Sequence, residues 1–166
     1  MVIEEHLYDY IVEARNQELT KETEERCRIH LLDTLVAIIS GSTLVPGKIA
    51  FKTASQFGSK PECSLIGRAG KVGAFEAALA NGMAAHADET DDSHLNGRFH
   101  PGCAIIPAAI AAGEISGSDS KFLLRAIALG YDIGARCNIA LGVEDPSKIR
   151  FSTHCFGGLF GAAAAA

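Results

Sequence analysis

The sequence predicts an all-α protein, a helical bundle of about six to seven helices. Three observations predict this class. Apolar residues recur at three- and four-residue intervals in several stretches, which is the spacing of one face of a helix. Alanine, the strongest helix former, is concentrated over residues 72–88 and at the C-terminal end. The chain has 166 residues, 48% of them hydrophobic, which is enough for one core, so we expect a single domain over residues 1–166.

In the first part of the chain, the apolar spacing predicts two helices. One covers residues 4–18, and the other follows Thr20, a suitable N-cap, with acidic residues in its first turn that complement the helix dipole. Gly41 ends this second helix. Glycines and prolines interrupt the pattern after it, and a helix over residues 49–57 and an extended piece over residues 63–66 fit between them.

The middle of the chain predicts three further helices. The alanine-rich helix over residues 72–88 is expected in the interior, because small side chains let helices approach closely. A proline opens the next helix, over residues 101–112, and Pro107 should kink that helix or lie near its start. Ser118 is expected to cap a long helix over residues 119–141.

The last part of the chain predicts a surface loop over residues 142–150 and a final helix that starts near His154. Gly157 and Gly161 form a G-x-x-x-G pattern, which we interpret as tight packing between helices of a soluble protein. The helix still lacks a polar last turn or a capping glycine at Ala166, so we expect the chain to be cut short at its C-terminus.

Composition excludes several classes of function. Fifteen basic residues against twenty acidic ones give a net charge of −5, without a basic cluster, so nucleic acid is not an expected partner. No apolar run approaches the length of about 20 residues that a membrane span needs, and the N-terminus does not resemble a signal peptide. Five widely spaced cysteines without a C-x-x-C pattern predict reduced thiols and a cytoplasmic protein.

Residues 86–102 are the segment most able to carry chemistry. Three of the six histidines and four of the twenty carboxylates fall within it, between two very apolar predicted helices. If the helix before it continues, His86, Glu89 and Ser93 share one face, because they are three and four residues apart. That arrangement would place a base, an acid and a hydroxyl in one row.

Two histidines are expected at helix N-termini. His100 precedes the proline that opens a helix, and the positive helix end there disfavours a protonated imidazole and attracts an anion. A neutral histidine beside a bound carboxylate is a candidate general base. His154 repeats the arrangement, with Ser152 and Thr153 as possible caps, so the two histidines could flank one carboxylic acid. Arg98 could pair with a carboxylate of the substrate.

Structural interpretations compete with these functional ones. Asp91 and Asp92 could serve surface solvation and helix capping, and His94 could be an ordinary loop residue. His6 and His30 lie on predicted helices without polar neighbours and are expected to be structural. The segment holds many possible metal ligands, but its spacing matches neither H-E-x-x-H nor an EF-hand loop. We therefore expect no metal, and a metal-dependent hydrolase remains an alternative.

Five pieces of the sequence together resemble the MmgE/PrpD family. The most specific pieces are residues 81–86 (NGMAAH), 91–93 (DDS) and 100–102 (HPG), which form an N-G-x-x-x-H…D-D-[ST]…H-P signature. Residues 31–35 (LLDTL) and 130–133 (GYDI) add to it. The family includes 2-methylcitrate dehydratase, cis-aconitate decarboxylase and iminodisuccinate epimerase, and the similarity runs over essentially the whole chain.

The resemblance implies a fold and a set of site residues. Members have a large helical domain and a smaller lid domain and are commonly homodimers, so this chain would be the N-terminal portion of the helical domain, without the lid. The catalytic positions carried over from the decarboxylases are Glu89, Ser93, His100 and His154. Glu89 replaces the usual aspartate, Ser93 replaces the usual threonine, and the loop before His100 is one residue longer. The resemblance implies no metal and no organic cofactor.

The resulting expectation is a lyase acting on small polycarboxylic acids by removal of a proton next to a carboxylate, with dehydration favoured. An epimerase, isomerase or decarboxylase of the same family is the alternative within this class. His86, Asp92 and Arg98 are expected to bind the substrate. A non-catalytic helical assembly subunit is the alternative outside it, and the expected partners are a second copy, a missing C-terminal segment or a separate partner chain.

Overall fold

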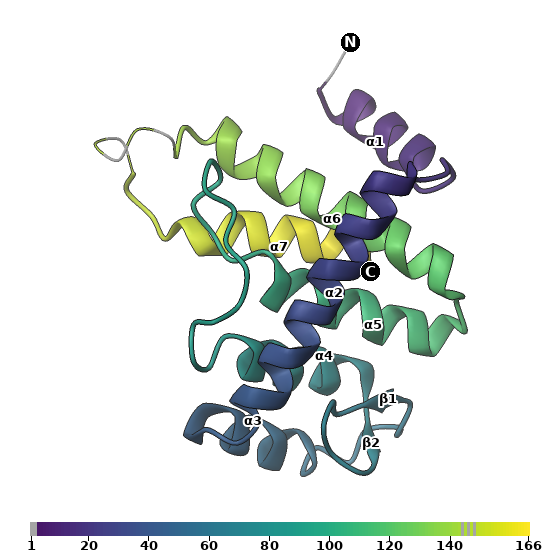
Figure 1. The fold of residues 1–166 in the computed structure, drawn as a ribbon, viewed down its shortest axis with the longest axis vertical. Helices are drawn as coiled ribbons and strands as arrows, with labels where there is room; N and C mark the ends of the chain where they lie inside the picture. Colours follow the sequence, from purple (N-terminus) through teal and green to yellow (C-terminus); the bar gives the residue numbers. More distant parts are fainter. Residues whose placement is uncertain (1–2, 144, 146, 148) are drawn as a thin grey trace.

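A computed structural model describes residues 3–143, 145, 147 and 149–166. Within them, the chain forms seven helices and one small antiparallel sheet of two strands (Figure 1). The all-α prediction is therefore confirmed. Helix α2 crosses the bundle diagonally, and the loop between α4 and α5 extends toward the start of α7 (Figure 1).

The N-terminal helices are α1 (Ile3–Ala14) and α2 (Lys21–Gly41). The predicted N-cap of α2 is confirmed, since Thr20 Oγ1 accepts a hydrogen bond of 3.1 Å from the backbone N–H of Thr23. Helix α1 ends four residues before the predicted position 18. It is tied to the bundle by the hydroxyl of Tyr10, which donates to Asp132 on α6 at 2.7 Å.

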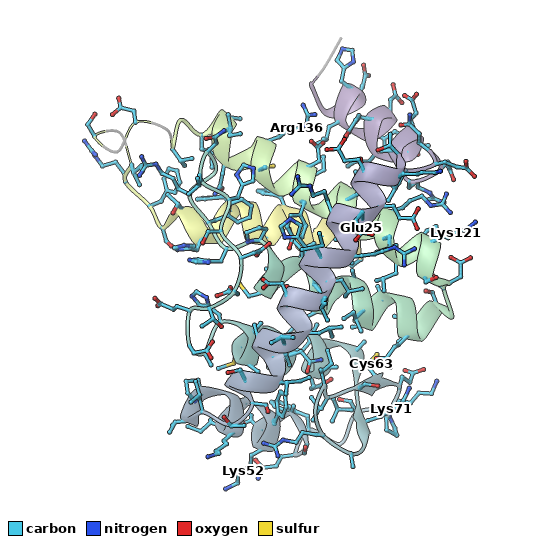
Figure 2. The ribbon with its side chains drawn as sticks, viewed as in Figure 1. Glu25, Lys52, Cys63, Lys71, Lys121 and Arg136 are labelled. Carbon is cyan, nitrogen blue, oxygen red and sulfur yellow. The ribbon has the colours of Figure 1, made fainter. Side chains whose placement is uncertain are left out.

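Helix α3 (Val45–Ala54) begins earlier than the predicted residue 49, because Pro46 fits the first turn of a helix and does not interrupt it. The extended piece is half of a hairpin, formed by β1 (Cys63–Ser64) and β2 (Lys71–Val72). Cys63 and Lys71, labelled in Figure 2, mark its two strands. Glu114 fastens the hairpin to α5 by accepting hydrogen bonds of 2.7 and 2.6 Å from the backbone N–H and the hydroxyl of Ser64.

Helices α4 (Ala74–Ala85) and α5 (Gly102–Ser116) flank the segment that carries the candidate site. Pro107 lies inside α5 and leaves the carbonyl of Cys103 without its helical N–H partner. This carbonyl packs against α4, where a Cβ added at Gly82 would lie 2.7 Å from its oxygen. The interior position predicted for the alanine-rich helix is confirmed by its buried residues Ala77, Ala80, Ala84 and Ala85.

Helices α6 (Ser120–Ala140) and α7 (Thr153–Ala165) pack against each other through glycines. The N-cap of α6 is Asp119, whose carboxylate accepts from the N–H of Phe122, so the predicted cap at Ser118 is wrong by one residue. The predicted loop over residues 142–150 lies partly outside the described residues, at positions 144, 146 and 148.

The G-x-x-x-G pattern of α7 faces glycines of α6. A Cβ at Gly130 would lie 2.8 Å from the carbonyl oxygen of Gly161, and a Cβ at Gly134 would lie 2.6 Å from that of Gly157. Four glycines therefore let the two backbones approach closely, which confirms the interpretation of this pattern as tight packing.

The buried apolar residues form two clusters. One lies among α3, α4 and the hairpin and includes Phe51 and Leu65, and the other joins α5 and α6 and includes Ile105, Ile106 and Ile127. Among the described helices, none alone is long and apolar enough to cross a membrane. Helices α2 and α3 together pass that test by length and composition, although the chain bends by 92° between them.

The glycine contacts predict opposite effects for two substitutions. Gly130→Ala should lower the free energy of unfolding by about 1–3 kcal/mol, because its methyl group would overlap Ile105 and the Gly161 carbonyl. Gly113→Ala on α5 has open space within 4 Å and should raise the free energy by about 0.5–1 kcal/mol. Urea unfolding measures both, and equal effects of the two substitutions would contradict this account of the packing.

Candidate active site

The segment between α4 and α5 is a loop and not a continuation of α4. Helix α4 ends at Ala85 with His86 as its C-cap, and Glu89 has a φ of +53°, which is incompatible with a right-handed helix. Asp88 holds this turn by accepting hydrogen bonds from the hydroxyls of Ser40 and Thr90, both at 2.8 Å. The expectation that His86, Glu89 and Ser93 share a helical face is therefore wrong.

The second half of the loop is a tight turn held against α6 and α7. His94 and Phe99 pair across it as an isolated β-bridge, and Arg98 within it has a φ of +50°. The Phe99 ring packs against α7, where a Cβ at Gly157 would lie 2.9 Å from Cε2 of that ring. Asn138 on α6 donates to the carbonyl of Gly97 at 2.8 Å and to that of Thr153, at the start of α7, at 2.6 Å.

The hydrogen bonds of Asn138 bring His154, at the start of α7, beside His86 and His100 of the loop. The ring centres of His100 and His154 are 5.1 Å apart and the rings are stacked, with 22° between their planes. The ring centre of His86 lies 5.1 Å from that of His100 and 6.3 Å from that of His154. The two histidines expected to flank one small acid are thus neighbours, while their chemical roles stay predictions.

Asp91 lies beneath two of these imidazoles. Its side chain is fully buried, with carboxylate oxygens 3.1 and 3.2 Å from Nδ1 of His86 and 3.8 Å from Nδ1 of His100. A carboxylate in this position is neither a surface nor a capping residue, so that interpretation of Asp91 is wrong. Cys103 lies nearby, and burial, followed by the charge of Asp91, raises the pKa of its thiol.

The hydrogen bonds of His100 define which nitrogen is free. Nδ1 donates to the backbone carbonyl of Asp92 at 2.8 Å, and the hydroxyl of Ser93 lies 3.2 Å from the same nitrogen. A carbonyl oxygen can only accept, so Nδ1 carries the proton in the neutral ring. The lone pair of His100 is therefore on Nε2, the nitrogen available to a substrate.

Asp92 faces the opposite way from Asp91, into the helical bundle. Its carboxylate accepts hydrogen bonds from Nδ1 of His30 at 2.8 Å, the hydroxyl of Tyr131 at 2.7 Å and the backbone N–H of Gly102 at 2.8 Å. The last bond occupies the first N–H of α5, where an anion was expected. A substrate would have to displace one of these donors to contact Asp92, and that contact stays a prediction.

The contact with Asp92 changes the titration of both partners. The hydrogen bond from His30 to this carboxylate raises the pKa of His30, and partial burial opposes that shift. Burial raises the pKa of Asp92, but the hydrogen bonds from His30, Tyr131 and Gly102 outweigh it and hold the pKa below its usual value. The expectation that His30 has no polar neighbour is therefore wrong.

An open hollow of about 460 Å³ adjoins the imidazoles. Four of the expected site residues line it, Ser93, Arg98, His100 and His154, and His94, Leu95 and Phe99 complete the lining. Partial burial, followed by the neighbouring His100 and His86, lowers the pKa of His154. Glu89 is exposed, and its negative charge opposes this shift by raising the pKa of His154.

The caps expected at Ser152 and Thr153 are partly correct, since Ser152 is the N-cap of α7 but makes no side-chain capping bond.

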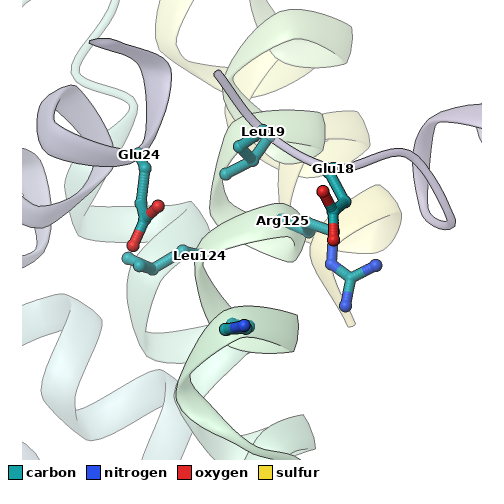
Figure 3. Close-up of a pocket in the computed structure, with 6 residues that line it drawn as sticks. Glu18, Leu19, Glu24, Leu124 and Arg125 are labelled. Carbon is teal, nitrogen blue, oxygen red and sulfur yellow. The ribbon is translucent and has the colours of Figure 1, made fainter. Parts of the chain in front are cut away.

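A second hollow, of about 140 Å³, lies between the start of α2 and the first turns of α6 (Figure 3). Glu18, Glu24 and Arg125 line it, together with Leu19, Lys121 and Leu124. No histidine or cysteine lines it, so the histidine cluster is the stronger candidate for acid–base chemistry.

Sequence reasoning did not identify His30, Tyr131 and Asn138. Tyr131 and Asn138 are seven residues apart on the buried face of α6, with Gly134 between them, so a polar residue on an apolar helical face was the available signal. His30 had no such signal, because its partner Asp92 comes from a loop whose path the sequence does not define.

Residues 5–166 match the MmgE/PrpD N-terminal domain. The chain therefore belongs to the MmgE/PrpD family, as the signature predicted. It is 27% identical over 167 residues to the cis-aconitate decarboxylase-like protein oryM of Aspergillus oryzae, which covers 95% of this chain and 34% of that protein. It is 26% identical over 147 residues to the cis-aconitate decarboxylase of Aspergillus terreus, which covers 86% of this chain and 29% of that protein. The chain thus spans about a third of the length of these relatives.

The pair formed by His30 and Asp92 predicts a pH-dependent stability. Because the pKa of His30 is raised in the folded state, its contribution is complete below the unfolded pKa of about 6.5 and is lost as the pH rises through the folded value. His30→Ala should lower the free energy of unfolding by about 1 kcal/mol at about pH 5.5, and by less at about pH 8.5.

Urea unfolding at the two pH values measures the difference, with His6→Ala as the control. His6 is exposed on α1, so its substitution should change the free energy by less than about 0.5 kcal/mol at either pH. An equal loss for His30→Ala at both pH values would contradict the assigned ion pair.

Proposed function

We propose that this chain forms part of a lyase active site in which His100 moves a proton next to a carboxylate of a small polycarboxylic acid. The observation that carries the proposal is the cluster of His86, His100 and His154 above the buried Asp91, beside a hollow that is open to solvent. Membership of a family whose matched relatives include a cis-aconitate decarboxylase supports the same class of reaction.

His100 is the proposed general base or acid. Its Nδ1 is engaged by the Asp92 carbonyl, so Nε2 is the atom that would accept the proton from the substrate carbon. Proton removal leaves negative charge on the carbon and its carboxylate, and nearby donors must stabilise that charge. Arg98 and the hydroxyl of Ser93 line the hollow and are the proposed donors, and His154 assists or binds a carboxylate.

Glu89 and His86 have supporting roles in this proposal. Glu89, at the rim, orients the substrate hydroxyl or a water molecule together with Ser93. His86 binds the substrate through its exposed edge, while Asp91 fixes the orientation of the ring by accepting from Nδ1. Asp92 acts on the substrate through His100, whose Nδ1 its backbone carbonyl holds.

Dehydration is the reaction that we propose for this site, in the manner of 2-methylcitrate dehydratase. The proton next to the carboxylate goes to His100, and the hydroxyl on the adjacent carbon takes up a proton, from His100 or from His154, and leaves as water. Decarboxylation is the second candidate, and the names of the matched relatives favour it. In that case carbon dioxide leaves and His100, starting in its protonated form, donates a proton to the resulting carbanion. Epimerisation would use the same proton removal without loss of a group.

The proposal also covers the location of the protein in the cell and its state of assembly. We propose a cytoplasmic location, which the five free thiols support, because such thiols persist in a reducing compartment. We propose a homodimer, as the resemblance to the family implies, or a complex with a further segment or partner chain; the chain spans about a third of the length of its relatives. A helical assembly subunit without activity is the alternative.

Replacement of His100 by asparagine tests the proposed role in the longest chain that the gene encodes. The amide of asparagine can still donate to the Asp92 carbonyl but has no basic nitrogen. His100→Asn should lower kcat on the dehydrated or decarboxylated acid by about 100-fold or more, with an unchanged melting temperature.

The matched control is His6→Ala, at an exposed position on α1 away from the hollow, which should keep its full activity. Turnover of His100→Asn within a factor of about three of the parent protein would contradict the assignment of His100. Turnover that disappears on treatment with a chelator would favour the metal-dependent hydrolase.

A further inference from the structure

Helix α2 is apolar on two opposite faces. Its inner face packs into the bundle through five buried residues, Cys27, Thr34, Ala37, Ile38 and Gly41. Its outer face carries four large apolar side chains, each between 51% and 63% exposed, which we call the outer stripe: Ile29, Leu32, Val36 and Ile39. In Figure 1, α2 is drawn in front of the helices that it crosses, so the outer stripe points away from the bundle. A helix that is apolar all round is normally buried on all sides, which indicates that a partner covers the stripe.

The outer stripe has the spacing of a two-stranded coiled coil. Its residues follow one another at intervals of three, four and three, which are the a and d positions of two heptads. Ile29 and Val36 at the a positions are β-branched, and Leu32 is at the first d position, a combination that favours two parallel helices. The buried residues of the inner face fall on positions b, c and f. The stripe can therefore contact a second helix without any loss of packing in the bundle.

Charged residues beside the stripe favour a second copy of this chain in the parallel orientation. Arg28 is at the g position before Ile29, and Asp33 is at the following e position, so Arg28 of each copy would pair with Asp33 of the other. Both side chains are exposed, and Asp33 makes no hydrogen bond or ion pair among the described residues. Arg28 contacts Glu24 of its own helix, and its guanidinium has further N–H donors. An antiparallel pair would instead place the two Asp33 carboxylates opposite each other, where like charges repel.

We propose that the outer stripe of α2 is the contact between two copies of this chain, with the two α2 helices parallel. The proposal rests on the homodimer of the proposed function and assigns its interface. Glu22 and Glu25 are at the preceding a and d positions, and repulsion between the copies there ends the contact, which therefore spans residues 28–39. The interface lies on the helix whose His30 and Ser40 hold the loop of the candidate active site.

The size of the stripe predicts a weak dimer. Four half-exposed side chains bury roughly 400 Å² per copy, which is half of the roughly 800 Å² per partner of a standard interface. The flanking Arg28 and Asp33 add to this area, but a contact of this size is at the low end for specific interfaces. We therefore expect a dissociation constant in the micromolar range.

Sedimentation equilibrium of the purified chain, at concentrations that span the micromolar range, tests the proposal. Leu32→Glu should weaken association by about tenfold or more, because it places two carboxylates in the apolar contact. Leu79→Glu is the matched control, since Leu79 is 54% exposed on α4 and lines the apolar groove between α3 and α4. This variant should associate as the parent chain does.

Cross-linking tests the parallel orientation. Leu32→Cys should form a disulfide-linked dimer on mild oxidation, because the d residues of two parallel helices face each other. The exposed Cys155 is replaced by serine in this experiment, so that the new thiol is the reactive one. In an antiparallel pair Leu32 would face Val36 of the other copy, so efficient cross-linking that requires Leu32→Cys and Val36→Cys together would overturn the parallel arrangement.

The failure of the interface can be distinguished from the failure of the homodimer. A dimer that persists in Leu32→Glu would overturn the interface and leave the homodimer in place, whether in this chain or in the longest chain that the gene encodes. Loss of association in Leu79→Glu instead would place the contact in the groove between α3 and α4. A parent chain that stays monomeric throughout would overturn both.

A membrane is the other occupant that an exposed apolar stripe could have. Binding of the parent chain to phosphatidylcholine vesicles that is lost in Leu32→Glu would assign the stripe to a lipid surface and overturn the proposal. We expect no such binding, because charged residues flank the stripe on both sides. The thermal unfolding of each variant separates loss of the contact from loss of the fold.

Discussion

Two consecutive carboxylates that face in opposite directions organise the site. Asp91 is buried under His86 and His100, whereas Asp92 accepts from His30 of α2, Gly102 of α5 and Tyr131 of α6. Because the two neighbouring side chains face opposite sides of the loop, one short stretch of chain serves both sides. Through Asp92 the bundle fixes the path of the loop, and through Asp91 the loop orients its imidazoles. A change to either carboxylate should therefore affect both packing and chemistry.

The third imidazole depends on the packing of α6 and α7. Because glycines line the contact between these helices, their backbones approach closely and α7 starts beside the loop that carries His100. Asn138 completes the arrangement by bonding to the turn at Gly97 and to Thr153 next to His154. A small-residue contact, which has no chemical role of its own, thus determines whether two distant histidines meet.

Much of the fold follows from the sequence, because local signals determine it. The apolar spacing, the Thr20 cap and the glycines of α7 predicted the helices and the close packing of α7 against another helix, which the structure identifies as α6. The signature also identified the loop and the family. The path of the loop was not predictable, since the positive φ of Glu89 and the bonds of Asp92 to three helices depend on residues far away in the chain. For the same reason His30 was missed.

The central claim is that acceptors in the loop hold the imidazoles of His86 and His100 in one tautomer. Long-range ¹H–¹⁵N correlation spectra of the chain with ¹⁵N-labelled histidine measure this directly, with His86→Gln and His100→Asn variants assigning the signals. The account predicts a proton on Nδ1 and a bare Nε2 for both residues in their neutral form. Protonated Nε2, or the averaged shifts of freely exchanging tautomers such as an exposed His6 should give, would contradict it.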